Sequence, residues 1–441
     1  MGYKRRASMT ALVLLFGALV SLSAANSLWA QGNTNLPADL QALIVEALKV
    51  NPEIKQMAEL KSASKETIRS AGALDDPEVG FIMKDIPVDT WAFNKEPMTQ
   101  KMLELSQKFP FPGKRRLRSE VAAEQYRSDD FSYKDKFNEI RAKMTMAYWG
   151  LSLAYTTFDI TEKNKKLWEQ AVQVTETRYR VGQGMQADVI QAQVELGNYL
   201  DRLLQWRQRQ ESLRADINAL RSQPPNEPVS RPQALRPRPF PIKLEQLLAL
   251  AEARPQLQAL KALIAKQEKA VALAKKDYYP DARVSVGYGF RETLASPINQ
   301  KQADMFTGAV MFNVPIWYGS KIQPRIREEQ AKQAAAKAAH QSAWNQLNAM
   351  IKDRYAKLQR LVQQINLYDQ GIIPQVRQAV EASLASYQVG ALAFAQLYQN
   401  LISVYNTELT LQEYLKDFEE NWAELEWLVG EELPRRPEGR K

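Results

Sequence analysis

Apolar residues recur at alternating steps of three and four positions in two long segments of the chain. Each position in the second segment lies 207 residues after its counterpart in the first, as Trp344 does after Phe137. This spacing is the heptad repeat of coiled-coil helices, so it predicts a seam, the apolar packing stripe of a coiled coil, in each of the two segments. Arg354 interrupts the second seam. Two interpretations are possible: the aliphatic stem of Arg354 lies along the seam, which we favour, or its charged end faces an aqueous lumen. The seam positions are Phe137, Ile140, Met144, Ala147, Leu151, Ala154 and Phe158, then Trp344, Leu347, Ile351, Arg354, Leu358, Leu361 and Ile365.

Two other segments alternate between apolar residues and small or polar ones, with the period of two that marks a β-strand. The pattern is clearest in 284–290 and 306–314, and a weaker copy runs through 79–83 and 103–109. Strands of about ten residues with one apolar face are typical of a membrane β-barrel wall. A soluble hairpin packed on a helix is the alternative. We therefore predict strand pairs at about 78–110 and 283–315.

Short motifs also occur twice, in the same order, which indicates an internal duplication. The sequence distance between paired motifs changes by only a few residues along the chain, as small loop insertions would produce. The paired motifs are Asn51-Pro52-Glu53-Ile54 with Arg254-Pro255-Gln256-Leu257, Phe109-Pro110-Phe111 with Val314-Pro315-Ile316, and Tyr179-Arg180-Val181-Gly182 with Tyr387-Gln388-Val389-Gly390.

Each copy is predicted to run in the same internal order: a helix, a strand pair, a long helix, a tight glycine turn and a returning helix. A stretch with seven prolines in 22 residues separates the copies and reads as an extended linker. The predicted parts are a signal peptide at 1–30; a first repeat at 31–221 with helices 114–179 and 185–221; the linker at 222–243; a second repeat at 244–430 with helices of about 322–387 and 391–428; and a flexible tail at 431–441.

The predicted lengths suggest how these pieces assemble. A helix of about 66 residues extends about 100 Å at 1.5 Å per residue, and the two shorter helices end to end match it. Four strands are too few to close a channel, because even eight fill the interior of a barrel with side chains. The sequence therefore predicts a mainly α protein with a small β part. Three protomers would form a 12-stranded outer-membrane β-barrel continued by a periplasmic tube of helical coiled-coil hairpins.

The N-terminus has the features of an export signal. Lys4, Arg5 and Arg6 precede the apolar run 10–22, and small residues end at Ala30, so we expect cleavage before Gln31. The chain has no cysteine, which excludes a processed lipoprotein terminus and disulfides. A formal net charge of +9 with no long basic block argues against a nucleic-acid partner.

Residues suited to catalysis are scarce, so we predict that the protein is not an enzyme and needs no cofactor. His340 is the only histidine and is predicted to lie on a helix surface, and no phosphate-binding loop or nucleophile motif is evident. Met83, Met98 and Met102 are candidate soft ligands for copper or silver, but ordinary apolar positions are the favoured interpretation.

These features together resemble the TolC-like family of outer-membrane efflux factors. The resemblance covers about residues 40–430 and rests on Asn51-Pro52, on the segment Phe109-Pro110-Phe111-Pro112-Gly113-Lys114, on the paired Tyr-x-x-Gly turns and on the duplication. The segment 109–114 and the short chain are most similar to the branch that serves heavy-metal exporters of the RND type (CusC- and CzcC-like). The resemblance implies a homotrimeric duct surrounded by outer-membrane lipid, which docks onto a periplasmic adaptor and an inner-membrane RND pump.

The resemblance also implies two sets of site residues. Adaptor docking falls on the hairpin tips, which here are Tyr179, Val181, Gly182, Gly184, Tyr387, Val389, Gly390 and Ala391. A periplasmic constriction falls on Tyr387, Leu392, Gln396 and Gln399. The family often has acidic residues where this chain has Gln396 and Gln399, and a basic residue where it has Leu392. We therefore expect an uncharged constriction narrowed by Tyr387 and Tyr398.

Two alternatives remain open at this stage. A multidrug or type I secretion duct of the same fold differs only in its pump and cargo. A soluble periplasmic coiled-coil scaffold or adaptor requires no membrane strands.

Overall fold

The computed structural model describes residues 36–435, which divide between two compact units. One unit combines the described part of Met1–Asn51 with Asn138–Glu252 and the described part of Ala349–Lys441. The other combines Pro52–Phe137 with Ala253–Asn348. Each unit therefore takes segments from both copies of the duplicated sequence. The predicted signal peptide at 1–30 lies outside the described residues.

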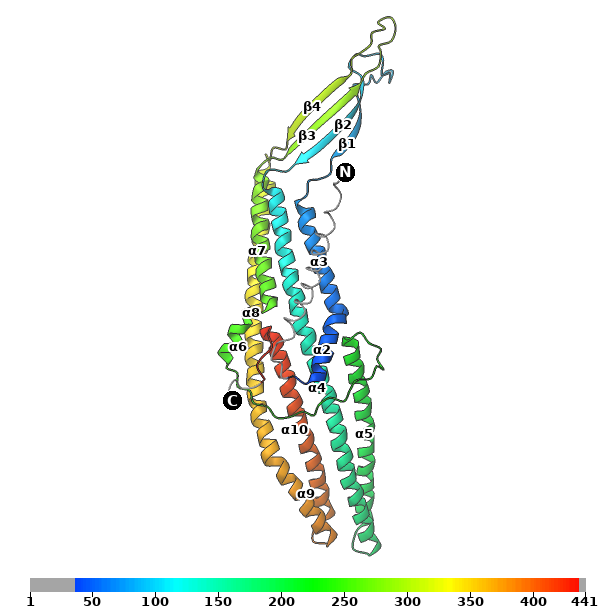
Figure 1. The fold of residues 1–441 in the computed structure, drawn as a ribbon, viewed down its shortest axis with the longest axis vertical. Helices are drawn as coiled ribbons and strands as arrows, with labels where there is room; N and C mark the ends of the chain where they lie inside the picture. The colour runs from blue at the N-terminus through cyan, green and yellow to red at the C-terminus, as the bar shows by residue number, and fades with distance from the viewer. Residues whose placement is uncertain (1–35, 436–441) are drawn as a thin grey trace, which may run out of the picture. The chain divides into compact units, whose positions relative to one another are not determined.

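The unit built from 52–137 and 253–348 contains a four-stranded antiparallel sheet in the order β1-β2-β3-β4 (Figure 1). The predicted strand pairs of the two copies are confirmed and lie next to each other, because β2 pairs directly with β3. The strands are β1 Glu78–Lys84, β2 Gln100–Phe109, β3 Ala282–Phe290 and β4 Met305–Phe312. The helices of this unit are α3 Pro52–Gly72 and α7 Pro255–Lys275, with the first parts of α4 Lys114–Arg180 and α8 Gln323–Leu367.

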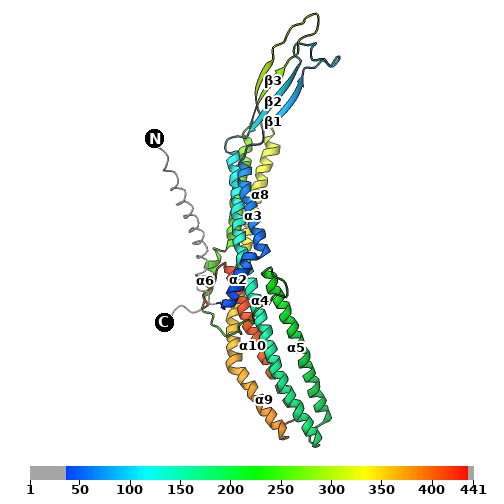
Figure 2. The ribbon, with the colours of Figure 1, turned by 45° about the vertical axis from the view of Figure 1, so that its right-hand side comes forward.

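The other unit is helical and contains two antiparallel hairpins, one formed by the end of α4 with α5 Gln186–Leu220 (Figure 2). The second joins α9 Ile373–Gln388 to α10 Phe394–Val429. This unit also contains two shorter helices, α2 Ala38–Val50 and α6 Leu244–Ala251, and the end of α8. Within residues 36–435, no helix is both long enough and apolar enough to cross a bilayer.

The helix boundaries follow from proline and glycine. Pro52 and Pro255 begin α3 and α7, where the missing proline N–H costs no hydrogen bond. The predicted continuous helix 322–387 is wrong in one detail, because a π-helical turn, η3 Tyr368–Ile372, separates α8 from α9. Pro374 explains this difference: its ring excludes the normal hydrogen bond to the carbonyl of Gln370 and crowds that carbonyl.

Most positions of the predicted seams are buried, whereas Phe137, Ala147, Phe158 and Trp344 are only partly buried. Ile140, Met144 and Leu151 on α4 are fully buried, as are Ile351 and Leu358 on α8. The guanidinium of Arg354 forms an ion pair with Glu424 of α10 at 2.9 Å, a partner that the sequence did not predict. The pair brings a charged residue into an otherwise apolar seam without leaving it unpartnered.

The linker and the C-terminal segment pack closely against the helical unit. Residues 222–243 form no helix or strand, yet Val229, Leu235 and Ile242 are buried. The prediction of a flexible tail from residue 431 does not hold for residues 431–435, since Leu433 and Arg435 are buried. Buried carboxylates on α10 bind this segment, and a composition-based prediction does not detect such partners.

Candidate functional site: an apolar sheet face and two hairpin tips

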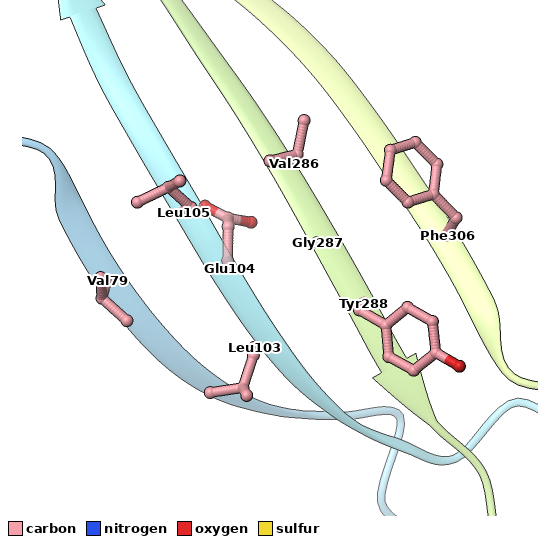
Figure 3. Close-up of a pocket in the computed structure, with 8 residues that line it drawn as sticks. All are labelled: Val79, Leu103, Glu104, Leu105, Val286, Gly287, Tyr288 and Phe306. Carbon is pink, nitrogen blue, oxygen red and sulfur yellow. The ribbon is translucent and has the colours of Figure 1, made fainter. Parts of the chain in front are cut away.

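One face of the four-stranded sheet is apolar and exposed. The strand register places Val79, Leu105, Val286 and Gly308 in one row, and Phe81, Leu103, Tyr288 and Phe306 in the next. Val79 and Phe306, on the two outer strands, are each 75% exposed. Side chains from all four strands line a shallow hollow on this face, as Figure 3 shows. Soluble proteins rarely leave a continuous apolar face exposed to water. We therefore expect lipid or another protein to cover this face.

The opposite face of the sheet is more polar and has several small residues, although Ile82, Met102, Met305 and Met311 also lie on it. The same register places Gly80, Glu104, Gly287 and Thr307 in one row, and Glu78, Ser106, Ser285 and Ala309 in another. Adjacent residues of a strand point to opposite faces, so Glu104 and Leu105 are on different sides. A sheet with one apolar and one polar face matches the wall of a water-filled membrane barrel.

The motif from Phe109 to Lys114 forms the junction between β2 and α4. Gly113 has φ +91°, a conformation that favours glycine. Phe111 stacks on Tyr279 with ring centroids 4.5 Å apart, and Lys114 is buried with its Nζ 2.8 Å from Asp281 Oδ1. Burial acts to raise the pKa of Asp281, but hydrogen bonds from Lys114 and from the Phe111 N–H outweigh it and lower that pKa. The junction is therefore held by a buried charge pair that survives at neutral pH.

The two helical hairpins end in closely similar turns. Gly182 and Gly390 both have positive φ, +72° and +82°. In each turn the glycine N–H donates to a tyrosine carbonyl, at 3.0 Å to Tyr179 and 3.1 Å to Tyr387. This is the left-handed glycine cap that ends a helix and lets the chain reverse. The duplicated Tyr-x-x-Gly motif therefore has a structural reason.

Several of the predicted tip residues are exposed. Val389 is 81% exposed and Val181 61%, and Tyr179 is half exposed. Ala391 is also exposed, and Gly184 is half-buried against Arg178. The tips thus present small apolar side chains around glycine backbone, which is a surface suited to packing against another protein.

Tyr387 is not part of either predicted site surface. It is 2% exposed and lies in the core between the hairpins, near Phe394, where burial raises the pKa of its hydroxyl. The prediction that Tyr387 narrows a constriction or contacts an adaptor is therefore wrong for this conformation. Its large ring fills the space beneath the second turn, which the sequence pattern alone does not reveal.

Arg178 joins the two tips and was missed by sequence reasoning. Its guanidinium lies over the Tyr387 ring, 4.6 Å from the centroid, and donates to the carbonyls of Tyr387 and Gln183. The corresponding position of the second copy is Ser386. An arginine in one copy at a position where the other copy has a serine is the sequence feature that could have identified Arg178.

We expect Arg178→Ala to loosen both turns. Hydrogen bonds to a charged group contribute about 1.5–3 kcal/mol, so amide exchange in 179–183 and 387–391 should accelerate about tenfold or more. Hydrogen-exchange mass spectrometry measures this, and Arg180→Ala, at an exposed neighbouring arginine, is the control. Equal exchange in both variants would mean that Arg178 does not hold the tips together.

The remaining predicted constriction residues lie in the second turn (Leu392) and at the start of α10 (Gln396 and Gln399). Gln396 and Gln399 are exposed, whereas Leu392 packs against the core of the hairpins. Tyr398 donates a hydrogen bond to Glu195 of α5 at 2.7 Å, which raises the pKa of the Tyr398 hydroxyl. The two glutamines are thus available to line an aqueous passage, while Tyr398 is engaged with the neighbouring hairpin.

A buried carboxylate connects the hairpins further from the tips. Glu408 on α10 is 3% exposed and accepts from Arg377 of α9 at 2.6 Å. It also accepts from Lys163 and Asn164 of α4, each at 3.3 Å. Three helices therefore share one buried charge, an arrangement that no local motif indicates.

The candidate metal ligands do not converge. Met83 and Met102 are on opposite faces of the sheet, because Met102 pairs with Ile82 and Met83 with Lys101. Among residues 36–435, no three His, Cys, Asp or Glu side chains gather in a way that suits a metal ion. His340, predicted to be a surface residue, is half-buried on α8.

Comparison with known proteins agrees with this architecture. The solved structure of the outer membrane protein VceC from Vibrio cholerae has a TM-score of 0.76 at 19% identity, covering 90% of this chain and 97% of that one. The channel CusC gives 0.74 at 16%, covering 90% and 93%. The open state of the outer membrane channel MtrE of Neisseria gonorrhoeae gives 0.73 at 16%, covering 92% and 95%. These likenesses establish the fold.

The search of curated proteins gave no match. The family model for outer membrane efflux proteins, however, matches residues 43–221 and 247–431, which are the two copies of the duplicated sequence. These ranges cover most of the chain. The chain therefore belongs to the outer membrane efflux protein family.

Proposed function

We propose that three copies of this chain form a passive exit duct, in which the four-stranded sheets join into one 12-stranded barrel in the outer membrane. The observation that carries this proposal is the exposed apolar face of the sheet opposite a polar one. Lipid would cover the apolar face, and the polar face would line water. Within residues 36–435 the outer strands β1 and β4 each pair on one side only, and pairing of β4 with β1 of the next copy would satisfy their other edges.

In this proposal the hairpin tips dock onto a periplasmic adaptor, which couples the duct to an inner-membrane RND pump. Val181 and Val389 offer exposed apolar contacts beside glycines that allow a partner's backbone to approach closely. Arg178 fixes the spacing of the two tips, so that the adaptor meets a preformed surface.

The proposed cargo is a heavy-metal cation. The support is the resemblance of the segment 109–114 to the heavy-metal branch, and a passive duct needs no metal ligand of its own. Deletion of the gene should make cells more sensitive to copper, silver or zinc salts than to organic drugs, with complementation as the control. Sensitivity to drugs alone would favour a multidrug duct of the same fold.

We expect Gln396→Asp combined with Gln399→Asp to make the duct more selective for cations. The change would place six carboxylates of the trimer at the proposed constriction, where rings of acidic side chains favour cations. The reversal potential in a planar bilayer under a salt gradient measures the effect. Gln396→Asn with Gln399→Asn is the uncharged control, and unchanged selectivity in the aspartate variant would exclude these positions from the constriction.

A further inference from the structure

We infer that the base of the sheet carries a binding site for the anionic headgroup of a phospholipid, built on Lys276, Phe111 and Tyr279. This inference rests on the proposed membrane location of the sheet. It assigns a ligand to a cluster that the formation of a channel does not itself require.

The cluster forms where the strands end. Phe109 ends β2 and Ala282 begins β3. Between β3 and α7 lies a 3-10 turn, η1 Lys276–Tyr278, and a π-helical turn, η2 Tyr318–Ile322, precedes α8. The two turns lie against each other, and Arg325 of α8 pairs with Asp277 of η1 at 2.8 Å.

Exposed aromatic side chains surround this position. Trp317 is 70% exposed, and Tyr278, Tyr279 and Tyr318 are also exposed. Tryptophan and tyrosine collect at the level of the headgroups because their rings are amphipathic. The aromatic residues therefore place the cluster at the boundary between the apolar sheet face and water.

The ammonium group of Lys276 contacts the faces of two aromatic rings and no carboxylate among residues 36–435. Its Nζ lies 5.5 Å from the Phe111 ring centroid and 5.3 Å from that of Tyr279, while these two rings stack on each other. Its stem passes over Gly113, where a Cβ would stand 3.8 Å from Cε. Among residues 36–435, no carboxylate lies within ion-pair distance of Lys276.

The local acids are already neutralised. Asp281 pairs with Lys114 at 2.8 Å, and Asp277 pairs with Arg325 at 2.8 Å and with Lys114 at 3.4 Å. These two acids and two bases sum to zero charge. Lys276 remains as surplus positive charge, and so does Lys321 of η2, which is exposed and lies four positions before Arg325 in the sequence.

An anionic phospholipid matches this arrangement better than a zwitterionic one. Its phosphate would accept from Lys276 and Lys321, while its acyl chains extend along the apolar sheet face. Juxtamembrane lysines are attracted to anionic lipid surfaces, whereas a zwitterionic headgroup brings its own cation to the site.

The test is native mass spectrometry of the detergent-extracted protein, incubated with equal amounts of phosphatidylglycerol and phosphatidylcholine of the same acyl chains. We expect the wild type to retain phosphatidylglycerol preferentially. Lys276→Gln with Lys321→Gln should weaken that binding roughly tenfold or more, because two attractive charges are lost. Lys337→Gln, at an exposed lysine further along α8, should leave it unchanged.

Three results would overturn the inference: no preference between the two lipids, no change in the double variant, or displacement of the lipid by millimolar inorganic phosphate. The last result would identify a site for free phosphate. These outcomes are distinct from a failure of the proposed function, because the same spectra report the oligomer. A trimer without bound phosphatidylglycerol contradicts only the lipid site, whereas a monomer contradicts the duct itself.

Discussion

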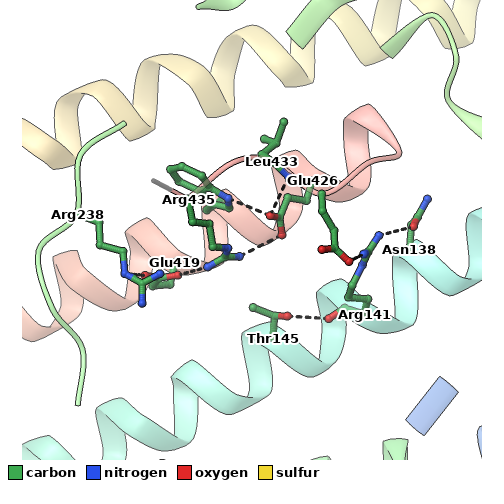
Figure 4. A network of polar contacts seen from close by, with 10 residues as sticks. Asn138, Arg141, Thr145, Arg238, Glu419, Glu426, Leu433 and Arg435 are labelled. Carbon is green, nitrogen blue, oxygen red and sulfur yellow. Dashed lines mark hydrogen bonds and ion pairs between the residues drawn. The ribbon is translucent and has the colours of Figure 1, made fainter. Parts of the chain in front are cut away.

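Replacing Arg435 by methionine should lower the free energy of unfolding of the helical unit by about 3–5 kcal/mol, the range for removing one partner of a buried ion pair. Arg435 pairs with Glu419 at 2.8 Å and with Glu426 at 3.1 Å, and all three side chains are at least nine-tenths buried (Figure 4). Without Arg435, the donors that Glu426 keeps among residues 36–435 are the neutral Trp422 Nε1 and the Leu433 N–H. The thermal denaturation midpoint of the purified protein measures the loss.

Arg354→Met is the matched control for this variant. The ion pair of Arg354 with Glu424 also holds α10, but both side chains are about one quarter exposed. Water can replace the lost partner there, so we expect a change within about 1 kcal/mol. Adding Glu426→Gln to Arg435→Met should recover part of the stability, because it removes a buried charge. Equal losses for the two arginine variants would show that burial of the Arg435 cluster is not what stabilises the C-terminal segment.

Placing an arginine on the apolar face of the sheet should prevent stable insertion into the outer membrane. Val310 lies on that face of β4, more than half exposed, and an arginine there faces lipid in the proposed barrel. An arginine at mid-membrane depth costs about 2–4 kcal/mol, and the trimer would contain three. We therefore expect Val310→Arg to lose most of its trimer from the outer-membrane fraction, as measured by native electrophoresis after fractionation.

Thr307→Arg provides the comparison on the same strand. Thr307 lies three positions away on the polar face and is also exposed. An arginine there would face water, so the trimer should still form, with altered ion selectivity as the main effect. Loss of the trimer in both variants, or in neither, would contradict the assignment of the two faces.

The sequence predicts the helices and strands of this fold well because their signals are local and occur twice. The heptad positions around Ile140 and Ile351 are buried, and the alternating strand residues around Val286 form one face. The proline at the start of α3 and its counterpart in α7 both begin helices, as a missing N–H favours. A repeated pattern in which each copy supports the other is a strong predictor of structure.

The features that sequence reasoning missed depend on contacts between distant segments. Arg178 and Tyr387 are 209 residues apart, and Glu408 lies 245 residues from Lys163. No periodicity encodes such a pair. For the same reason the burial of Tyr387 was not predicted: a tyrosine beside a glycine turn is compatible with an exposed tip or with a filled core. Resemblance to a family identifies a position but does not determine its environment.

In the proposed function, three copies of this chain assemble as one channel in the outer membrane. Electron microscopy of the protein extracted from outer membranes with detergent tests this assembly most directly. We predict a hollow trimer with a closed 12-stranded barrel, in which Val310 faces detergent and Thr307 faces the lumen. A monomer or dimer recovered in the soluble periplasmic fraction, with its sheet covered by another protein, would contradict it.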